Sequence, residues 1–223
     1  MTELNKRETL VINLFAGPGA GKTTCAWEIA SKLKKLGYVT EYVGEYAKEL
    51  VWDGRADLLN GTVENQRAVY VEQKRRVDRL IGKVDFIVTD SPAILSMTYL
   101  KERNAEFEKK MVDDFHRYHN FCVFVERGTH YEKEGRLQTE EESKELDREI
   151  KALLEENGIF YGTYKHHTID LSIDNMQKTF QKLNPGVKTK VSLNEQIVDA
   201  NSKCSNKEPS SVSINRKKET IVR

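Results

Sequence analysis

Cysteine is scarce in this sequence of 223 residues, and its three cysteines stand far apart without a Cys-x-x-Cys pair. This spacing excludes a disulfide-stabilised framework and a cysteine-based metal site. Cys25 and Cys122 lie in segments of apolar pattern, which predicts reduced thiols in the core, whereas Cys204 is expected to be exposed near the chain's end. The five histidines form no metal-ligand spacing with each other or with cysteine, so we expect no zinc site.

Long apolar runs and a strong net charge are missing as well. No segment is long enough to cross a bilayer, and the N-terminal residues lack the pattern of a secretory signal. The formal net charge is +1, so no overall field attracts the protein to nucleic acid or to membranes, although a local basic groove stays open. We therefore expect a cytoplasmic protein without a membrane partner, in a compartment rich in ATP.

A glycine-rich stretch between an apolar run and a helical pattern is the most informative motif. The stretch AGPGAGKT occupies residues 16–23, and Ala16 stands where the usual pattern has its first glycine. The glycines let several backbone N–H groups point at one anion, the helix dipole and a lysine add positive charge, and the threonine hydroxyl can ligate Mg²⁺. The residues expected to bind ATP are Gly17, Pro18, Gly19, Ala20, Gly21, Lys22, Thr23 and Thr24.

Strand and helix patterns alternate along the chain, which predicts an α/β fold with a parallel sheet and right-handed crossovers. Strands are expected at residues 10–15, 38–43, 84–90, 121–125 and 158–164. Helices are expected at residues 24–36, 44–52, 63–81, 93–103, 105–116, 139–156 and 169–183.

The expected domain organisation is one kinase-like domain followed by a polar tail. The domain covers residues 1–183, with a loose start at residues 1–8, a mobile stretch at 53–62 and a lid at about 127–139. Residues 184–223 are rich in Ser, Asn and Lys and contain no aromatic residue, which predicts a disordered or loosely docked tail.

Two carboxylates follow predicted strands and are candidate catalytic residues. Asp90 ends the strand at 84–90 and could hold Mg²⁺ through water beside Thr23; the alternative is a capping aspartate ahead of Pro92. Glu45 follows the strand at 38–43, where a carboxylate can accept or orient the proton of an attacking hydroxyl. The alternative is that Glu45 only favours the start of its helix through the dipole. Which of the two is the general base stays open.

The predicted lid supplies two candidate catalytic arginines, Arg127 and Arg136, with Gly128 and Gly135 giving the loop its freedom. Phosphoryl transfer spreads negative charge that such arginines can stabilise; the alternative is that both are solvated surface residues. The following helix has like-charged i,i+4 spacings such as Glu141–Glu145, which predicts a solvated face without site residues.

Other side chains could surround the phosphate acceptor. Tyr46, Trp52 and Arg55 could shape an acceptor pocket, although Trp52 fits the core equally well. The long helix at 63–81 carries polar residues that are expected to face solvent and could alternatively line an anionic acceptor. They are Gln66, Gln73, Lys74, Arg75, Arg76 and Arg79.

Several of these motifs together resemble a known family. The sequence GEYAKEL at residues 44–50 is similar to the Glu-Tyr-x-Arg-Glu segment of ribosylnicotinamide kinase domains in the bifunctional regulator of NAD biosynthesis. Later motifs follow in the same order, namely Asn65-Gln66 and Gln73, then Asp90, then Glu134-Gly135-Arg136. The chain also resembles small P-loop ATPase-like kinases of bacteriophages, in which a strand ending in Thr-Asp-Ser-Pro recurs, as at residues 89–92. The resemblance covers about residues 9–165.

The resemblance implies a P-loop kinase-like three-layer sandwich whose five-stranded parallel sheet has the order 2-3-1-4-5. It also implies MgATP as the donor and a ribose or deoxyribose hydroxyl as the acceptor. By the same resemblance, Lys22 and Thr23 hold the β- and γ-phosphates and Mg²⁺. Glu45 and Asp90 face the acceptor and the metal, and Arg136 is the lid arginine.

The resulting prediction is an ATP-dependent phosphotransferase that moves the γ-phosphoryl group to a hydroxyl of a nucleoside-like substrate, with nicotinamide riboside as the leading candidate. One alternative keeps the chemistry but changes the acceptor to a nucleotide or to 5-hydroxymethyluracil within DNA. A second alternative is a regulatory P-loop ATPase that changes the state of a partner protein.

Overall fold

The computed structural model describes residues 7–128, 138–165 and 169–187. Five parallel strands form one sheet in the order β2-β3-β1-β4-β5. The strands are β1 (Leu10–Phe15), β2 (Thr40–Val43), β3 (Phe86–Thr89), β4 (His119–Val125) and β5 (Gly162–Tyr164). The predicted α/β class and the strand order 2-3-1-4-5 are therefore confirmed.

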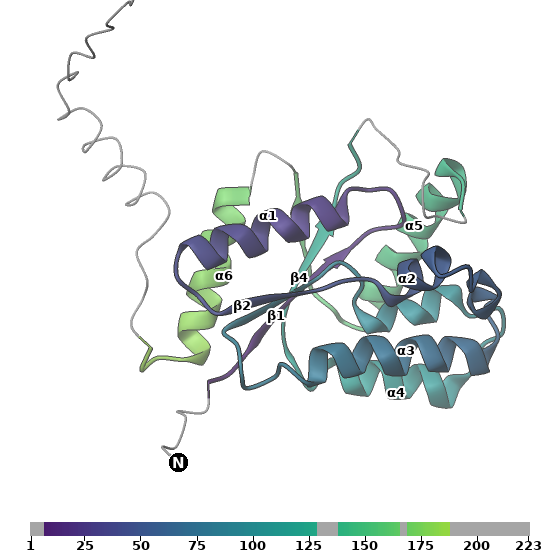
Figure 1. Cartoon of the computed structure of the whole chain (residues 1–223), viewed down its shortest axis with the longest axis horizontal. Helices are drawn as coiled ribbons and strands as arrows, with labels where there is room; N and C mark the ends of the chain where they lie inside the picture. Colours follow the sequence, from purple (N-terminus) through teal and green to yellow (C-terminus); the bar gives the residue numbers. More distant parts are fainter. Residues whose placement is uncertain (1–6, 129–137, 166–168, 188–223) are drawn as a thin grey trace, which may run out of the picture. The chain divides into compact units, whose positions relative to one another are not determined.

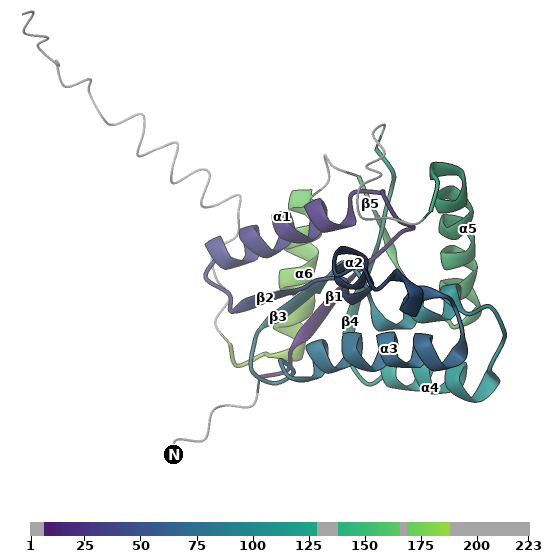
Figure 2. The same ribbon diagram turned by 45° about the vertical axis from the view of Figure 1, so that its right-hand side comes forward.

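Helices cover both faces of the sheet. Helices α1 (Lys22–Lys35) and α6 (Ile169–Leu183) lie together on one face, and α3 (Val63–Asp78) and α4 (Ala105–Phe115) lie on the other (Figures 1 and 2). Two further helices follow strands, namely α2 (Tyr46–Trp52) after β2 and α5 (Glu140–Glu156) after β4. The helices of the described ranges are all too short or too polar to span a lipid bilayer.

The core consists of the central strand β1 and of the side chains packed between the sheet and the helices on each of its faces. All six residues of β1 are buried, as its continuous apolar character predicts. On the face covered by α6, the ring of Phe86 lies 5.0 Å from Tyr38 and 4.9 Å from Phe180, measured between ring centroids. These aromatic contacts anchor α6 to the sheet.

The two cysteines in the described part of the chain are buried, free thiols, which confirms their predicted place in the core. Burial raises the pKa of Cys25 to about 11 and the pKa of Cys122 to about 12. Both side chains therefore stay protonated at neutral pH and act as small apolar groups.

The register of the strands brings their carboxyl ends to one edge. Thr89 at the end of β3 pairs with Val43 of β2 and with Asn13 of β1. The glycine-rich loop, Glu45 and Asp90 follow these strand ends directly. This edge is where open parallel sheets bind their ligands.

Several segments differ from the sequence-based expectation. Strand β5 begins at Gly162 and not at 158, and α3 ends at Asp78 and not at 81. The helix expected at 93–103 is the 3₁₀ helix η2 (Ala93–Tyr99), because Leu100 is extended and Lys101 donates its N–H to the carbonyl of Gly61 at 2.9 Å. The stretch at 53–62, expected to be mobile, contains a second 3₁₀ helix, η1 (Ala56–Leu59).

Helix α5 begins with a reciprocal cap and carries opposite-charge pairs that the like-charge spacing did not predict. The Thr139 hydroxyl accepts from the Glu142 N–H, and the Glu142 carboxylate accepts from the Thr139 N–H. Lys144 pairs with Glu140 at 2.7 Å. These contacts fix where the helix starts.

Candidate functional site

The glycine-rich loop joins β1 to α1 at the carboxyl edge of the sheet. Gly19 and Gly21 have φ values of 75° and 86°, in the left-handed region that favours glycine. Gly21 is the N-cap of α1 and has no side chain to cap the helix. The first N–H groups of α1 therefore stay available to a ligand, as anion binding at a helix N-terminus requires.

Lys22 folds back onto this loop. Its Nζ donates to the carbonyl of Ala16 at 2.7 Å and to the carbonyl of Gly17 at 3.0 Å. Burial lowers the pKa of Lys22, and the nearby carboxylates of Glu45, Asp90 and Asp147 oppose that shift. A partly buried cation among carboxylates is thus the electrostatic centre of the site.

Asp90 is 2% exposed and receives two hydrogen bonds on a single oxygen. Its Oδ2 accepts from the Thr23 hydroxyl at 2.5 Å and from the Tyr42 hydroxyl at 2.8 Å. Its buried Oδ1 has no hydrogen-bond partner among the described residues. A hydroxyl and a carboxylate oxygen held together in this way form the hard oxygen set that Mg²⁺ prefers, so these side chains fit the ion.

Tyr42 of β2 is a site residue that the sequence analysis missed. Burial raises the pKa of its phenol, and the charges of Asp90 and Glu45 raise it further, so the hydroxyl remains a donor at neutral pH. Tyr42 pairs with Val88 in the sheet register, two residues before Asp90. Only that register, which the sequence pattern alone does not define, would have indicated the contact.

Glu45 is the N-cap residue of α2, with φ −74° and ψ 114°, but its side chain does not cap the helix. Its carboxylate instead acts electrostatically on three groups of the site. It opposes the lowering of the Lys22 pKa and raises the pKa values of Tyr42 and Tyr99. The structure therefore brings the charge of Glu45 close to that of Lys22.

Arg127 lies between the glycine-rich loop and α5. Its guanidinium pairs with Asp147 and donates to the carbonyls of Pro18 and Ser143, each at 2.7 Å. Arg136, the other predicted lid arginine, and most of the predicted lid lie outside the described residues.

Asp147 and Ser143 connect α5 to the glycine-rich loop, so the expectation that this helix carries no site residues is wrong. The Gly17 N–H donates to Asp147 Oδ1 at 2.5 Å. A Cβ atom at position 17 would lie 2.4 Å from the Ser143 carbonyl oxygen. Glycine is therefore required there by the close approach of α5, and this contact between distant segments left no local sequence signal.

Basic residues of α3 pair with neighbouring acids. Lys74 pairs with Asp78 at 2.6 Å, and Arg75 pairs with Glu72 at 2.7 Å. These pairs support the solvated reading for Lys74 and Arg75, but Gln66 and Gln73 are each 3% exposed, so the expectation that these two residues face solvent is wrong. Trp52 at the end of α2 is 65% exposed, so the alternative that it lies in the core is wrong, and its place in an acceptor pocket stays a prediction.

Comparisons with known proteins give a family and several structural likenesses. A family model described as an AAA domain matches residues 11–169, well over half of the chain. A search of curated protein sequences found no match.

Three solved structures are similar over most of the chain. Kti12 from Chaetomium thermophilum in complex with ADP-AlF3 has a TM-score of 0.46 at 12% identity and covers 76% of this chain and 98% of its own. Shikimate kinase from Acinetobacter baumannii in complex with shikimate has a TM-score of 0.42 at 14% identity, with coverages of 82% and 97%. The APS kinase CysC of Mycobacterium tuberculosis has a TM-score of 0.35 at 19% identity, with coverages of 67% and 99%. At these scores the likeness assigns no activity.

Proposed function

The chain belongs to the AAA domain family, and from the geometry of its site we propose that it is a P-loop phosphotransferase. It moves the γ-phosphoryl group of ATP to a hydroxyl of a nucleoside-like acceptor, with nicotinamide riboside as the leading candidate. The proposal rests on one observation: Lys22, the Thr23–Asp90 pair and the charged Glu45 lie close together at one edge of the sheet. Phosphoryl transfer needs these parts, namely a fixed cation, a metal-holding oxygen set and a carboxylate for the acceptor.

The glycine-rich loop and Lys22 form the donor side. The N–H groups at the start of α1 would bind the phosphates of ATP, and Lys22 would exchange its carbonyl partners for phosphate oxygens. Thr23 and Asp90 would hold Mg²⁺, which when bound neutralises the charge that develops on the phosphates. Lys22 and the loop are fixed before reaction, so they stabilise that charge with little reorganisation.

We assign the acceptor side to Glu45. Asp90 already engages one oxygen with two donors, and its other oxygen is buried, which suits a metal ligand better than a proton acceptor. Glu45 follows β2 at the carboxyl edge of the sheet, where its charge acts on Lys22, and in this proposal its carboxylate orients the attacking hydroxyl and takes its proton.

A regulatory ATPase is the second candidate, and the match to the AAA domain family is the observation that favours it. In that function the same loop would bind and hydrolyse ATP, and the product would be free phosphate. The two candidates differ in where the phosphoryl group goes.

A transfer assay with γ-labelled ATP tests the proposal. The acceptors are nicotinamide riboside, common nucleosides and nucleotides, and DNA with and without 5-hydroxymethyluracil. Label on a small nucleoside would support the proposal and identify the substrate. Label on DNA would instead establish the DNA-modifying alternative, and phosphate release without a labelled acceptor would favour the ATPase.

The control for this assay is Lys22→Ala, which removes the fixed cation from the phosphate site. We expect a loss of about 100-fold or more in turnover. Turnover within a few-fold of the parent would contradict the assigned site, whichever acceptor is labelled.

A further inference from the structure

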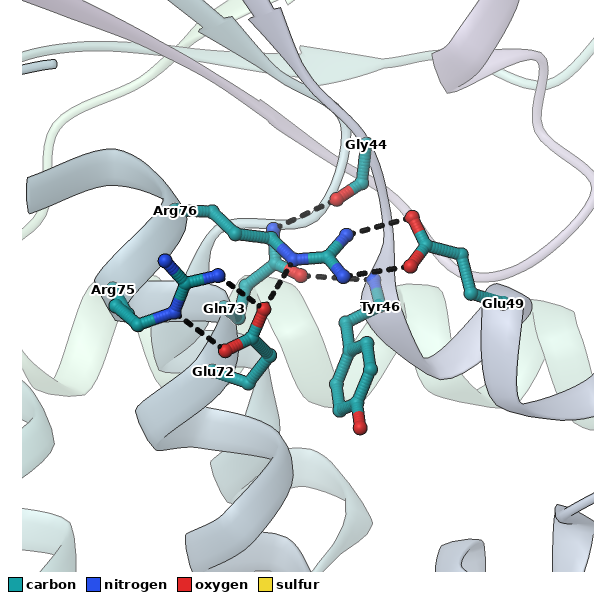
Figure 3. Close-up of polar contacts among 7 residues, drawn as sticks. All are labelled: Gly44, Tyr46, Glu49, Glu72, Gln73, Arg75 and Arg76. Carbon is teal, nitrogen blue, oxygen red and sulfur yellow. Dashed lines mark hydrogen bonds and ion pairs between the residues drawn. The ribbon is translucent and has the colours of Figure 1, made fainter. Parts of the chain in front are cut away.

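A single side-chain amide from α3 binds the backbone on both sides of Glu45. Gln73 Nε2 donates to the Gly44 carbonyl at 3.1 Å, and the Tyr46 N–H donates to Gln73 Oε1 at 2.9 Å (Figure 3). Gln73 is 3% exposed, so these hydrogen bonds form away from water. An amide suits this place because it offers a donor and an acceptor in one plane.

The two bonds fix the conformation of the intervening residue. The Gly44 carbonyl belongs to the peptide group before Glu45, and the Tyr46 N–H belongs to the peptide group after it. The rotation between those peptide groups is set by φ and ψ of Glu45, which are −74° and 114°. With both peptide groups held by one amide, the direction in which the Glu45 side chain leaves the backbone is fixed.

Charged neighbours hold α2 against α3 from the outside. Arg76 donates to both carboxylate oxygens of Glu49 at 2.6 Å and lies over the Tyr46 ring, 4.8 Å from its centroid (Figure 3). Arg76 also donates to Glu72 at 2.9 Å. Glu49 is half exposed, so this pair adds little by itself. The buried amide is the contact that reaches the backbone of Glu45.

We propose that Gln73 is a positioning residue for Glu45, acting through the Gly44–Tyr46 backbone. This inference rests on the proposed role of Glu45 at the acceptor. A group that must meet an attacking hydroxyl has to be held in place before the reaction, and small misplacements are costly. Gln73 supplies that restraint from a helix on the far side of the turn.

The test compares three single variants. Gln73→Met has a similar volume and removes both hydrogen bonds. Gln73→Glu keeps an acceptor for the Tyr46 N–H but loses the donor to Gly44. Gln177→Met is the matched control. Gln177 lies on α6, is also buried, and donates to the Tyr38 hydroxyl at 3.2 Å.

We expect Gln73→Met to lower kcat by roughly 10- to 100-fold, with the KM for ATP nearly unchanged. Placed in a Glu45→Gln background, the same change should lower kcat by less than about two-fold further, because residues that act through one another are not additive. The Gln177→Met control should lower the melting temperature without a comparable loss of kcat. Additive losses of kcat in the double variant would overturn the proposal.

Amide hydrogen exchange gives a readout that does not depend on transferase activity. The Tyr46 N–H should exchange faster in Gln73→Met than in the parent, remain protected in Gln73→Glu, and be unchanged in Gln177→Met. Unchanged exchange in Gln73→Met would overturn the positioning role. If the parent protein labels no acceptor, the proposed function fails, and the exchange result alone decides whether Gln73 holds this turn.

Discussion

Lys22 is a partly buried ammonium group whose hydrogen-bond partners come from its own loop. Two carbonyls of its own loop accept from Nζ, and burial lowers its pKa despite three nearby carboxylates. In the folded protein the charged form of this residue is therefore held at a cost to stability. Such a cost is common at sites that must present a fixed charge to a ligand.

The lowered pKa of Lys22 predicts a pH-dependent difference between the parent and Lys22→Met. The folded-state value lies below the ordinary 10.5, so between the two values the unfolded chain binds more protons. The stability of the parent should then rise relative to Lys22→Met as the pH is raised towards 10.5. Urea unfolding across that range measures the difference, with the exposed Lys109→Met as control; a difference that does not change with pH would contradict it.

Asp90 allows a second prediction at the residue scale. Its Oδ1 is buried and has no hydrogen-bond partner in the described ranges, whereas its Oδ2 is held by Thr23 and Tyr42. If Asp90 holds Mg²⁺ through water, Asp90→Asn should weaken ATP binding by about 10- to 100-fold in the presence of Mg²⁺. The loss should be much smaller when EDTA removes the ion.

Calorimetric titrations of both proteins with ATP would measure this difference. Asp113→Asn on the exposed face of α4 is the control. Equal losses with and without Mg²⁺ would show that Asp90 does not act through the metal.

The sequence identified the parts of the site that are contiguous and missed those that meet through folding. The glycine-rich loop, Glu45 and Asp90 could be located because each follows a segment with a strand pattern. Tyr42 and Asp147 could not, since they contact partners 48 and 130 residues away. Their positions depend on strand register and on the docking of α5, which no local pattern encodes.

At the scale of elements, α5 and the glycine-rich loop are docked through charge and close approach. Asp147 accepts from the Gly17 N–H, and Arg127 connects the Pro18 carbonyl to Asp147 and Ser143. Arg127 and Asp147 are each mostly buried, so removing one leaves the other charge poorly solvated. The conformation of the loop therefore depends on α5 as well as on its own glycines.

Asp147→Ala should loosen this contact. We expect the free energy of unfolding to fall by about 1–3 kcal/mol, because Arg127 and the Gly17 N–H lose their acceptor. Nucleotide affinity should fall as well, since the loop is no longer held from α5. Chemical unfolding and ATP titration measure the two effects.

The neighbouring exposed residue gives the control, Arg148→Ala, which should change neither quantity appreciably. Gly17→Ala should resemble Asp147→Ala, because its added methyl group would meet the Ser143 carbonyl at 2.4 Å. Unaltered nucleotide binding in both Gly17→Ala and Asp147→Ala would show that the loop does not need α5.

Element boundaries followed from the sequence where local chemistry defines them. Strand β1 and helix α6 have the predicted bounds, and α5 starts directly after its capping threonine. Other bounds differ, since β5 begins at Gly162 and not at 158, and α3 ends at Asp78 and not at 81. At η2, a backbone contact between Lys101 and Gly61 draws the chain out of the expected helix. Such a contact between distant turns overrides helix propensity, which is a weak preference.

At the scale of the whole molecule, the two ends of the described chain are joined beside the sheet. Asn184 follows α6 and is 7% exposed. Its Nδ2 donates to the Glu8 carbonyl at 3.0 Å, and its Oδ1 accepts from the Glu8 N–H at 2.9 Å. Arg7 pairs with Asp85 at 2.9 Å. Residues 7 and 8, expected to be loose, are thus held by both the sheet and the residue after α6.

These contacts predict how far the chain can be shortened. The boundary expected from the sequence lies between residues 183 and 184, but a chain ending at Leu183 would lose the Asn184 amide, and a chain ending at Lys188 would keep it. We expect the chain that ends at Lys188 to melt at the temperature of the full chain. For the chain that ends at Leu183, the free energy of unfolding should fall by about 1–3 kcal/mol, since the Glu8 backbone groups lose their partners. This loss corresponds to several degrees in melting temperature for a domain of this size.

Asn184→Ala in the full chain separates the amide from the remainder of the tail. It should reproduce the loss seen on ending the chain at Leu183, whereas Asn175→Ala on the exposed face of α6 should not. A chain ending at Lys188 that melts well below the full chain would mean that residues beyond 188 stabilise the fold. In that case the tail would belong to the folded domain, and the boundary would have to move towards the C-terminus.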